Sequence, residues 1–440
     1  MLSREDNDLL CRVGPGTLTG DLLRQYWLPA FLSWEVEADG PPLRLRLLGE
    51  DLVAYRDTEG RVGLLADNCP HRGASMWFGR NEEHGLRCVY HGWKFDRSGA
   101  CVDMPNEPPE SNFKNKVRIT AYQCAERNGV VWAYMGPRSL PAPPPELPWA
   151  TLPESHCYLS MRVQECNWAQ AVEGGIDSSH VSFLHSWMDP ERRPLPPGTT
   201  RSMLPLYAVT DRHPHFEVLD TDNGILVGAR RDAEADSYYW RITQFLLPFY
   251  TMIPGSLDPN WNIGGHAWVP MDDAHTMTWS MTWNYERPLT PEEVAQMASF
   301  PGGGIHYGRA GMKPMTTQPG GKWTPALCAE NDFGLDRELQ RTKLYIGIEQ
   351  FGTQDSAIQE TMGTIYDRTR EHLGSADTGI IRYRRRVMNA AKALREQGAP
   401  APGVDTPEAY WVRSAALVIP RSANWVEASR VALVAPAAAV

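Results

Sequence analysis

The sequence has no excess of positive charge, since 43 Lys and Arg residues stand against 53 Asp and Glu, a net charge of -10. A nucleic-acid partner is therefore not expected, because non-specific binding to nucleic acid needs a basic surface. Long apolar runs are also missing. Residues 431–440 are the most apolar stretch, but they include Pro436 and are shorter than the roughly 20 residues of a membrane helix. The N-terminus, MLSREDNDLL, lacks a signal-peptide segment. We expect a cytoplasmic protein that does not bind a membrane.

Cysteines and nucleotide-binding motifs are scarce. The 8 Cys residues are spread over 440 positions, which argues against a disulfide scaffold. No G-x-G-x-x-G precedes a ribose-binding acid, and Gly14-Pro15-Gly16 is only a turn-like fragment. We therefore expect no nicotinamide or flavin site in this chain. With 42% hydrophobic and 22% charged residues, the composition is that of a globular protein.

The N-terminal third changes from a helical to a β pattern. Residues 1–39 are expected to be helical as far as about Leu32. Residues 40–136 are expected to form a small all-β unit, because short alternating segments with turn residues between them are typical of strands. These segments lie at 43–48, 51–57, 61–67, 85–90, 93–96, 117–122 and 130–134.

A proline-rich segment separates this unit from the rest. Residues 137–153 contain seven prolines, which suit a stiff linker rather than the interior of a strand or helix. Residues 154–440 mix both kinds of element, with strands expected at 156–166 and within 206–283, helices at 167–185 and 353–372, and a loop at 301–321. The whole pattern predicts an α+β protein.

Four Cys and His residues form an interleaved pattern. Cys69 and His71 lie on one expected loop, and Cys88 and His91 on another, with the spacing C-x-H-x16-C-x2-H. Two thiolates and two imidazoles suit either zinc or a [2Fe–2S] cluster, but a zinc finger usually pairs Cys with Cys and His with His. One Cys and one His from each loop suit a Rieske centre. The alternative is a set of core residues that bind no metal.

The sequence around these residues, NCPHRGASMWFGRNEEHGLRCVYHGWKFDRSGACVDMP, resembles Rieske domains. The resemblance implies that Cys69, His71, Cys88 and His91 bind a [2Fe–2S] cluster. The other six cysteines have no partner pattern, and we expect them to be small buried residues: Cys11, Cys101, Cys124, Cys157, Cys166 and Cys328.

A second motif, ECNWAQAVEGGIDSSHVSFLH, covers residues 165–185. His180 and His185 are five residues apart, so on a regular helix they do not share a face. They converge only at an irregular turn, which Gly174-Gly175 and Ser178-Ser179 make plausible. On spacing alone, a structural role for both histidines is the simpler interpretation.

The D-x2-H-x4-H pattern in this stretch resembles the mononuclear iron motif of Rieske non-haem oxygenases, in the branch of phthalate dioxygenase. The likeness extends from VGPGT near the start to LGSADTGI at 373–380. It implies an N-terminal Rieske domain and a C-terminal helix-grip-like catalytic domain, an antiparallel sheet with helices. It also implies a mononuclear Fe(II) held by His180, His185 and one carboxylate, which leaves positions open for O2 and substrate.

The third iron ligand is expected on a later helix, as in the family. We choose Asp355, which lies three residues before Ile358 and seven before Met362 and should face the same apolar interior. A buried unpaired carboxylate is costly, and a metal removes that cost. The alternative role of Asp355 is a charge at a helix N-terminus. The other local candidates are Asp332, Asp336, Glu349 and Glu360.

Asp177 lies three residues before His180. By itself it is either a surface carboxylate or a residue that orients His180. The resemblance implies that it bridges a Rieske histidine of one subunit to an iron-bound histidine of the next. That implies a homo-oligomer, a trimer or stacked trimers, with electrons crossing between chains.

Arg241 interrupts an apolar block at residues 238–254. It either binds a substrate carboxylate or pairs with an internal acid. Arg201 is a weaker candidate because it lies on an expected loop.

The resemblance implies a terminal oxygenase subunit that oxidises an aromatic substrate, such as an aryl carboxylate, with O2. Electrons then come from NADH through a separate reductase that carries flavin and a plant-type iron–sulfur cluster. One alternative is a Rieske monooxygenase or O-demethylase of methoxyarenes on the same fold. An alternative of another class is a Rieske electron-transfer protein without oxygenase activity.

Overall fold

The computed structural model describes residues 1–189 and 204–436. Two short helices begin the chain, α1 (Arg4–Cys11) and α2 (Leu18–Leu23). The hydroxyls of Ser3 and Thr17 cap them by accepting backbone N–H groups three residues ahead. The following segment, β1 (Trp27–Leu32), is a strand paired with residues 130–134. The expected helix is therefore wrong from Trp27 onward, because pairing with a distant strand overrides the local leucine pattern.

An antiparallel sheet forms the body of the N-terminal unit, in the strand order β1-β10-β9-β4-β3-β2. Its strands after β1 are β2 (Leu43–Leu47), β3 (Glu50–Arg56), β4 (Val62–Ala66), β9 (Ala121–Arg127) and β10 (Val130–Tyr134). The expected strands near 43–48, 51–57, 61–67 and 130–134 are confirmed. The strand expected at 117–122 begins only at Ala121.

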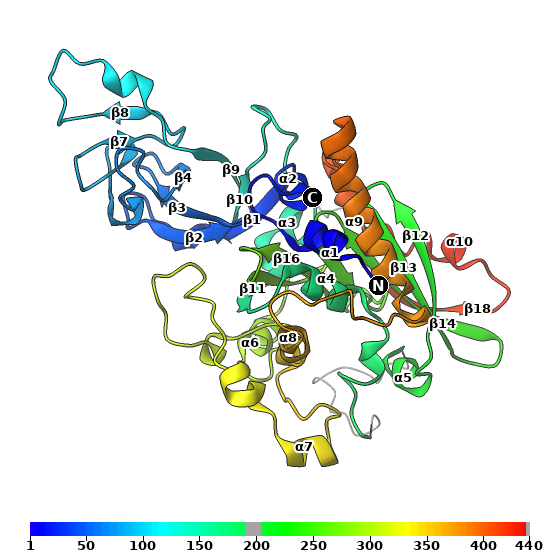
Figure 1. Ribbon diagram of the computed structural model, residues 1–440. Helices are drawn as coiled ribbons and strands as arrows, with labels where there is room; N and C mark the ends of the chain where they lie inside the picture. Colours follow the sequence, from blue (N-terminus) through cyan, green and yellow to red (C-terminus); the bar gives the residue numbers. More distant parts are fainter. Residues whose placement is uncertain (190–203, 437–440) are drawn as a thin grey trace.

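A smaller sheet lies at the outer end of this unit, in the order β5-β6-β7-β8 (Figure 1). Its strands are β5 (Arg80–Glu82), β6 (Gly85–Arg87), β7 (Lys94–Phe95) and β8 (Cys101–Asp103). Strands expected at 85–90 and 93–96 are thus shorter than the pattern suggested, because the chain turns away into a loop after Arg87.

The proline-rich segment contains one short helix, α3 (Pro148–Thr151), which begins with a proline. Proline suits this place because the first helical residue needs no hydrogen bond from its backbone nitrogen. The boundaries expected between the four parts of the chain stay predictions.

The C-terminal unit is built on an eight-stranded antiparallel sheet, in the order β11-β17-β16-β15-β14-β13-β12, with β18 paired to β14. Its strands are β11 (Cys157–Gln164), β12 (His215–Thr221), β13 (Gly224–Asp232), β14 (Ser237–Leu246), β15 (Tyr250–Ile253), β16 (Ile263–Pro270), β17 (Thr276–Trp283) and β18 (Ala415–Pro420).

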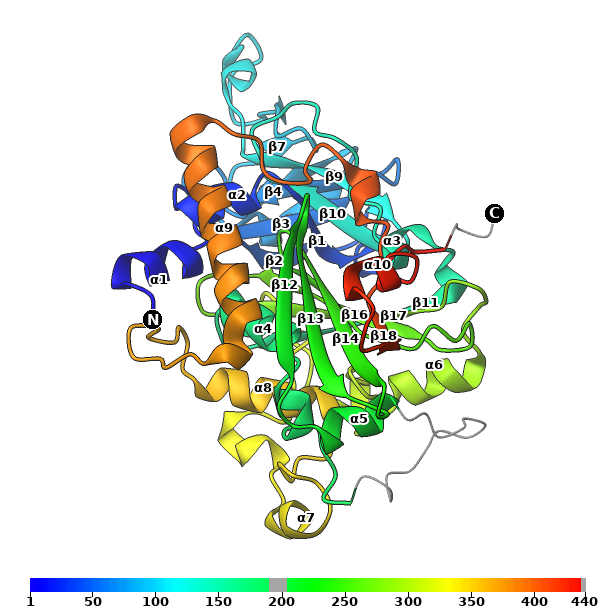
Figure 2. The same cartoon turned by 90° about the vertical axis from the view of Figure 1, so that its right-hand side faces the viewer.

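Helices pack on this sheet and extend beyond it. The described helices are α4 (Trp168–Ile176), α5 (Leu204–Thr210), α6 (Pro291–Ala298), α7 (Arg337–Thr342), α8 (Phe351–Thr361), α9 (Thr378–Gln397) and α10 (Trp425–Ser429). The long helix α9 runs along β12 and β13, and α4 lies against β15, β16 and α8 (Figures 1 and 2). The segregated sheets and helices confirm the α+β prediction.

Close contact between α4 and the sheet depends on one glycine. A Cβ atom on Gly175 would lie 2.8 Å from the indole nitrogen of Trp268 on β16. That nitrogen donates a hydrogen bond to Thr251 on β15 at 2.9 Å. Gly175 therefore lets the end of α4, and the turn that follows it, approach the polar face of the sheet.

The two units are joined where two strand turns meet. The backbone N–H groups of Leu48 and Gly49, between β2 and β3, donate to the carbonyls of Pro270 and Met271, at 3.1 and 2.8 Å. No helix within residues 1–189 and 204–436 is long and apolar enough to span a membrane.

Candidate metal sites

Two equivalent loops hold the four Cys and His residues at the outer end of the N-terminal unit. In each loop the backbone N–H of a glycine four residues after the cysteine donates to the cysteine carbonyl, at 2.8 Å for Gly73 and 3.0 Å for Gly92. Both glycines have positive φ angles, +75° and +79°. This conformation favours glycine because a side chain would be strained there. The spacing of Cys and His alone does not point to these glycines, although C-P-H-R-G and C-V-Y-H-G show them at matching places in the sequence.

The loops bring the two cysteines beside each other and the two histidines beside each other. Cys69 and Cys88 are each 2% exposed, and the rings of His71 and His91 lie with their centroids 4.4 Å apart. The Nδ1 atom of His91 is buried and has no hydrogen-bond partner within the described structure. Burial also raises the pKa of Cys69 to about 11. Burial thus disfavours the thiolate unless a cation stabilises it, and the unpaired imidazole nitrogen also lacks a partner, so this donor set fits an iron–sulfur cluster.

The second group of residues lies in the C-terminal unit. Asp177 ends α4, His180 begins a short 3-10 turn (His180–Ser182), and His185 follows it. Asp355 comes from α8, 170 positions further along the sequence. One ligand atom from each of His180, His185 and Asp355 lies within 4.8 Å of the other two. The irregular turn after Gly174-Gly175 thus brings together two histidines that a regular helix would separate.

The ligand atoms of this group all face one another. The Nε2 atoms of His180 and His185 are 3.1 Å apart, and Asp355 Oδ1 lies 3.7 and 3.3 Å from them. The Nδ1 atom of His180 lies 3.2 Å from Asp177 Oδ2, and that of His185 lies 2.7 Å from Gln354 Oε1. Since both partners are acceptors, each Nδ1 carries the proton and each Nε2 presents a lone pair. Three lone pairs facing one another repel unless a cation lies among them, so this donor set fits a metal ion.

Charge and burial act in opposite directions on these groups. Burial raises the pKa of Asp355, but His185 and His180 outweigh it and hold this pKa well below its ordinary value. Burial lowers the pKa of His180, whereas the hydrogen bond and charge of Asp177 raise it, and the net shift is upward. Asp355 is therefore an ionised carboxylate, as a metal ligand must be.

The apolar surroundings that the sequence predicts for Asp355 are wrong. Ile358 and Met362 do not lie in the interior beside it but are 42% and 43% exposed. The helix is also shorter than expected, because α8 ends at Thr361 and Gly363 has a φ of +90°. The buried face of α8 is mostly polar, because its side chains hydrogen-bond to other buried polar groups. The buried residues of α8 are Gly352, Thr353, Gln354, Ser356, Ala357 and Gln359.

The other acidic candidates lie elsewhere. Asp336 caps α7, and Asp332 and Glu349 are exposed. Glu360 lies near Glu165, and burial raises its pKa to about 7. Asp355 is thus the carboxylate that the structure brings to the two histidines.

Arg241 lies on β14, on the same sheet face as Arg231 of β13, as the strand register shows. Its Nε atom donates to Ser178 Oγ at 3.2 Å, and its charge acts on the pKa of His180. No described carboxylate forms an ion pair with it, so its two terminal nitrogens are available to a ligand. Arg201, the weaker candidate, lies outside the described residues.

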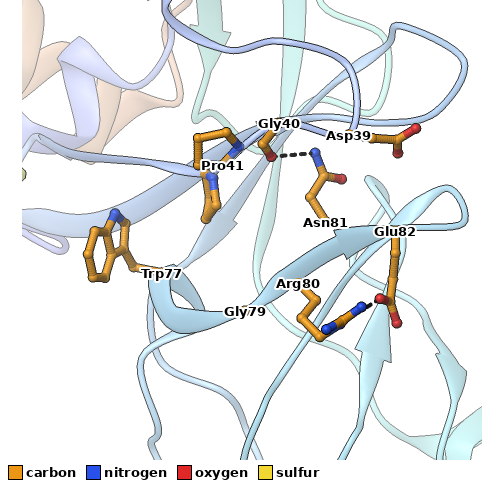
Figure 3. Close-up of a pocket in the computed structure, with 9 residues that line it drawn as sticks. Asp39, Gly40, Pro41, Trp77, Gly79, Arg80, Asn81 and Glu82 are labelled. Atoms are coloured by element: carbon orange, nitrogen blue, oxygen red, sulfur yellow. Dashed lines mark hydrogen bonds and ion pairs between the residues drawn. The ribbon is translucent and has the colours of Figure 1, made fainter.

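A hollow of about 450 Å³ lies on the N-terminal unit (Figure 3). Trp77 and Arg80 line it, and Asn81 donates to the carbonyl of Gly40 at 3.0 Å. None of the residues expected to bind metal lines this hollow.

Two known protein families together match most of the chain. Residues 26–123 match the Rieske [2Fe-2S] domain family, and residues 133–436 match the family described as LigXa C-terminal domain like. The oxygenase subunit of 3-chlorobenzoate-3,4-dioxygenase from Comamonas testosteroni is 41% identical over 428 residues, 97% of each chain. The chain belongs to the Rieske non-haem iron oxygenases, as an oxygenase α subunit.

Two further relatives are similar to this oxygenase subunit in sequence, and a solved structure is similar to it in fold. The oxygenase subunit of phthalate 4,5-dioxygenase from Pseudomonas putida is 39% identical over 90% of this chain and 87% of its own. That of 5,5'-dehydrodivanillate O-demethylase from Sphingobium sp. (strain NBRC 103272 / SYK-6) is 34% identical, over 88% and 80%. Dicamba monooxygenase bound to dicamba has the same fold, with a TM-score of 0.56 and 17% identity over 85% of this chain and 99% of its own. Family and fold class are thus confirmed, with the [2Fe–2S] cluster and mononuclear iron as the family's cofactors.

Proposed function

We propose that this oxygenase subunit oxidises an aryl carboxylate with O2 at a mononuclear iron held by His180, His185 and Asp355. One observation carries the proposal: two imidazole lone pairs and an ionised carboxylate face one another within 4.8 Å, with no donor among them. When bound, iron in a site of two histidines and one carboxylate supplies O2 activation, because it keeps coordination positions open. Cys69, His71, Cys88 and His91 hold the [2Fe–2S] cluster in this proposal.

The chain's own residues prepare this site. Asp177 keeps a proton on Nδ1 of His180, so that Nε2 stays free to bind a cation. Phe351 stacks on the ring of His185, with centroids 4.1 Å apart. Helices α4 and α8, from which the two ligand-bearing segments come, pack against each other.

The proposal includes a homo-oligomer, a trimer or stacked trimers. The loop of Cys88 and His91 leads into β7, and β7 lies well apart from α8 in both views (Figures 1 and 2). An electron therefore travels between chains, and Asp177 links His180 to a cluster histidine of a neighbour. Exposed apolar side chains near both sites support such a contact: Val89 and Tyr90 at one, Phe183, Met188 and Tyr345 at the other.

Electrons enter from a separate protein in this proposal, since the sequence has no nucleotide-binding motif. The partner is an NADH-dependent reductase with flavin and a plant-type iron–sulfur cluster, and the system is cytoplasmic. Curated relatives named as oxygenase subunits support a divided system of this kind.

Arg241 supports an anionic substrate. Its guanidinium is near His180 and has no carboxylate partner among the described residues. A substrate carboxylate would supply that partner through two parallel hydrogen bonds and would orient the ring toward the iron. O-demethylation of a methoxyarene is the second candidate, because one relative carries the name of such an enzyme.

A product screen tests the proposal. The purified oxygenase, a surrogate reductase and NADH are given benzoates, phthalates and methoxyarenes, and product masses are read. A dihydroxylated aryl carboxylate supports the main proposal, and loss of a methyl group supports the second candidate. Reduction and reoxidation of the cluster without any oxygenated product would favour an electron carrier.

A further inference from the structure

Gln354 is a buried amide that touches one of the proposed iron ligands. It lies in the first turns of α8, directly before Asp355, and is 4% exposed. Its Oε1 atom is 2.7 Å from Nδ1 of His185. Its Nε2 atom donates to the carbonyl of Ile348 at 2.7 Å. The side chain therefore spans the distance between His185 and the loop that leads into α8.

These two contacts fix the direction of the hydrogen bonds that link the Ile348 carbonyl, the Gln354 amide and the His185 ring. The Ile348 carbonyl can only accept, so the amide nitrogen of Gln354 must point toward it. The amide oxygen then faces His185, and an oxygen can only accept from Nδ1–H. His185 is therefore protonated on Nδ1, and its Nε2 lone pair points toward Asp355 at 3.3 Å.

Backbone hydrogen bonds hold the segments that carry Ile348 and His185 in place. Residues 186–188 and 343–345 are joined by two backbone hydrogen bonds, from Met188 to Lys343 at 2.8 Å and from Tyr345 to Ser186 at 3.1 Å. The loop that carries Ile348 is thus tied to the segment that carries His185. The amide of Gln354 lies between two parts of the chain whose separation is fixed.

We propose that Gln354 is a positioning residue that sets the tautomer and ring orientation of His185 for metal binding. The inference rests on the proposed iron site and adds to it. The two histidines are then oriented differently: His180 by the anionic carboxylate of Asp177, and His185 by a neutral amide. A neutral acceptor fixes the proton on Nδ1 without adding negative charge to a site that already contains Asp355.

Metal affinity tests this role apart from turnover. The protein keeps its cluster, its mononuclear iron is removed with a chelator, and Co(II) uptake is measured by anaerobic equilibrium dialysis. Cobalt can be counted separately from cluster iron. Gln354→Met keeps the length of the side chain but removes the acceptor, and it should weaken Co(II) binding about 10- to 100-fold. Gln354→Glu restores an acceptor and should bind Co(II) more tightly than the Met variant.

A matched control comes from the same helix. Gln359 is 3% exposed and accepts a hydrogen bond from Gln164 at 2.7 Å, but it contacts neither histidine. Gln359→Met removes a buried amide from the same helix, as Gln354→Met does, but should leave the affinity for Co(II) unchanged. The cluster absorption spectrum and the melting temperature check that each variant is folded.

The outcomes separate the inference from the proposed function. Co(II) affinity in Gln354→Met equal to that of the parent would overturn the inference, as would Gln354→Glu binding no better than Gln354→Met, since packing alone would then be lost. Asp355→Ala reports on the site itself. If the parent takes up no more Co(II) than Asp355→Ala, the proposed iron site is wrong, whatever Gln354 does.

Discussion

Asp177 contacts His180 at two points, because its Oδ2 atom lies 3.2 Å from the ring nitrogen Nδ1 and 3.3 Å from the backbone nitrogen. The other carboxylate oxygen accepts from the backbone of Ser179 at 2.6 Å. The carboxylate thus holds both the ring of His180 and the turn that carries it. It is 22% exposed, so a further partner can reach it.

Asp177→Asn should leave both metal sites assembled and stop the passage of electrons between them. The variant keeps the shape of the side chain but loses its charge and half of its acceptor capacity. The cluster should still be reduced chemically. A single-turnover experiment on pre-reduced protein, with substrate and O2, measures cluster oxidation and product together. Product formed at the parent rate would show that Asp177 stabilises the turn but has no role in electron transfer.

Arg241→Met should weaken binding of a carboxylated substrate far more than binding of its uncharged analogue. One bidentate charge-assisted contact is worth about 1.5–3 kcal/mol, which is roughly tenfold to more than hundredfold in affinity. The control is Arg230→Met, because Arg230 lies on the opposite face of the sheet and stacks on Tyr238. Titration of both ligands measures the difference. Equal weakening of both by Arg241→Met would indicate a structural role.

His275 should make stability depend on pH near the junction of the two units. Its Nδ1 and Nε2 atoms lie 2.8 and 3.2 Å from Asp272 and Glu165, and Asp272 also pairs with Arg46. The hydrogen bonds that His275 donates to the carboxylates of Asp272 and Glu165 raise its pKa from 6.5 to about 10. A raised pKa means that the charged form stabilises the fold fully below pH 6.5, and that this contribution is lost as the pH rises through about 10.

The melting temperatures of the parent and His275→Gln should therefore differ most near pH 6 and converge near pH 10. His213→Gln is the control, since His213 is exposed and its substitution should give no such convergence. A His275→Gln difference that stays constant from pH 6 to 10 would show that the hydrogen bonds matter without the charge.

Local motifs made one part of the site predictable. Cys69, His71, Cys88 and His91 lie in two tight loops whose spacing is visible in the sequence, and the structure brings them together. The helix expected up to Leu32 failed at β1, because its partner strand lies about a hundred positions away. Local propensity carries no information about such a partner.

The second site depended on contacts that no local pattern shows. His180 and His185 converge only because the turn after α4 is irregular, and the family resemblance, not their spacing, pointed to them. The prediction of Asp355 rests partly on Ile358 and Met362, which the structure leaves exposed. Gln354 was missed because its role depends on reaching His185, which lies 169 positions earlier. A glutamine beside an acid gives no signal of that kind.

The cluster should show a Rieske-type paramagnetic resonance signal after reduction, because Cys and His ligands together shape that spectrum. Cys88→Ser should abolish the signal, while Cys328→Ser should keep it, since Cys328 lies outside the two loops. A colourless protein with stoichiometric zinc would show that the four residues form a different centre.

His180, His185 and Asp355 should hold a third iron in addition to those of the cluster. Iron and acid-labile sulfide are counted per chain, in the parent and in Asp355→Ala. The parent should contain about three iron atoms and about two sulfides per chain. Asp355→Ala should keep the sulfide and the cluster spectrum, contain about two iron atoms and form no product. A parent with iron equal to sulfide, or an Asp355→Ala variant that retains the extra iron and full turnover, would show that these three residues do not form the iron site.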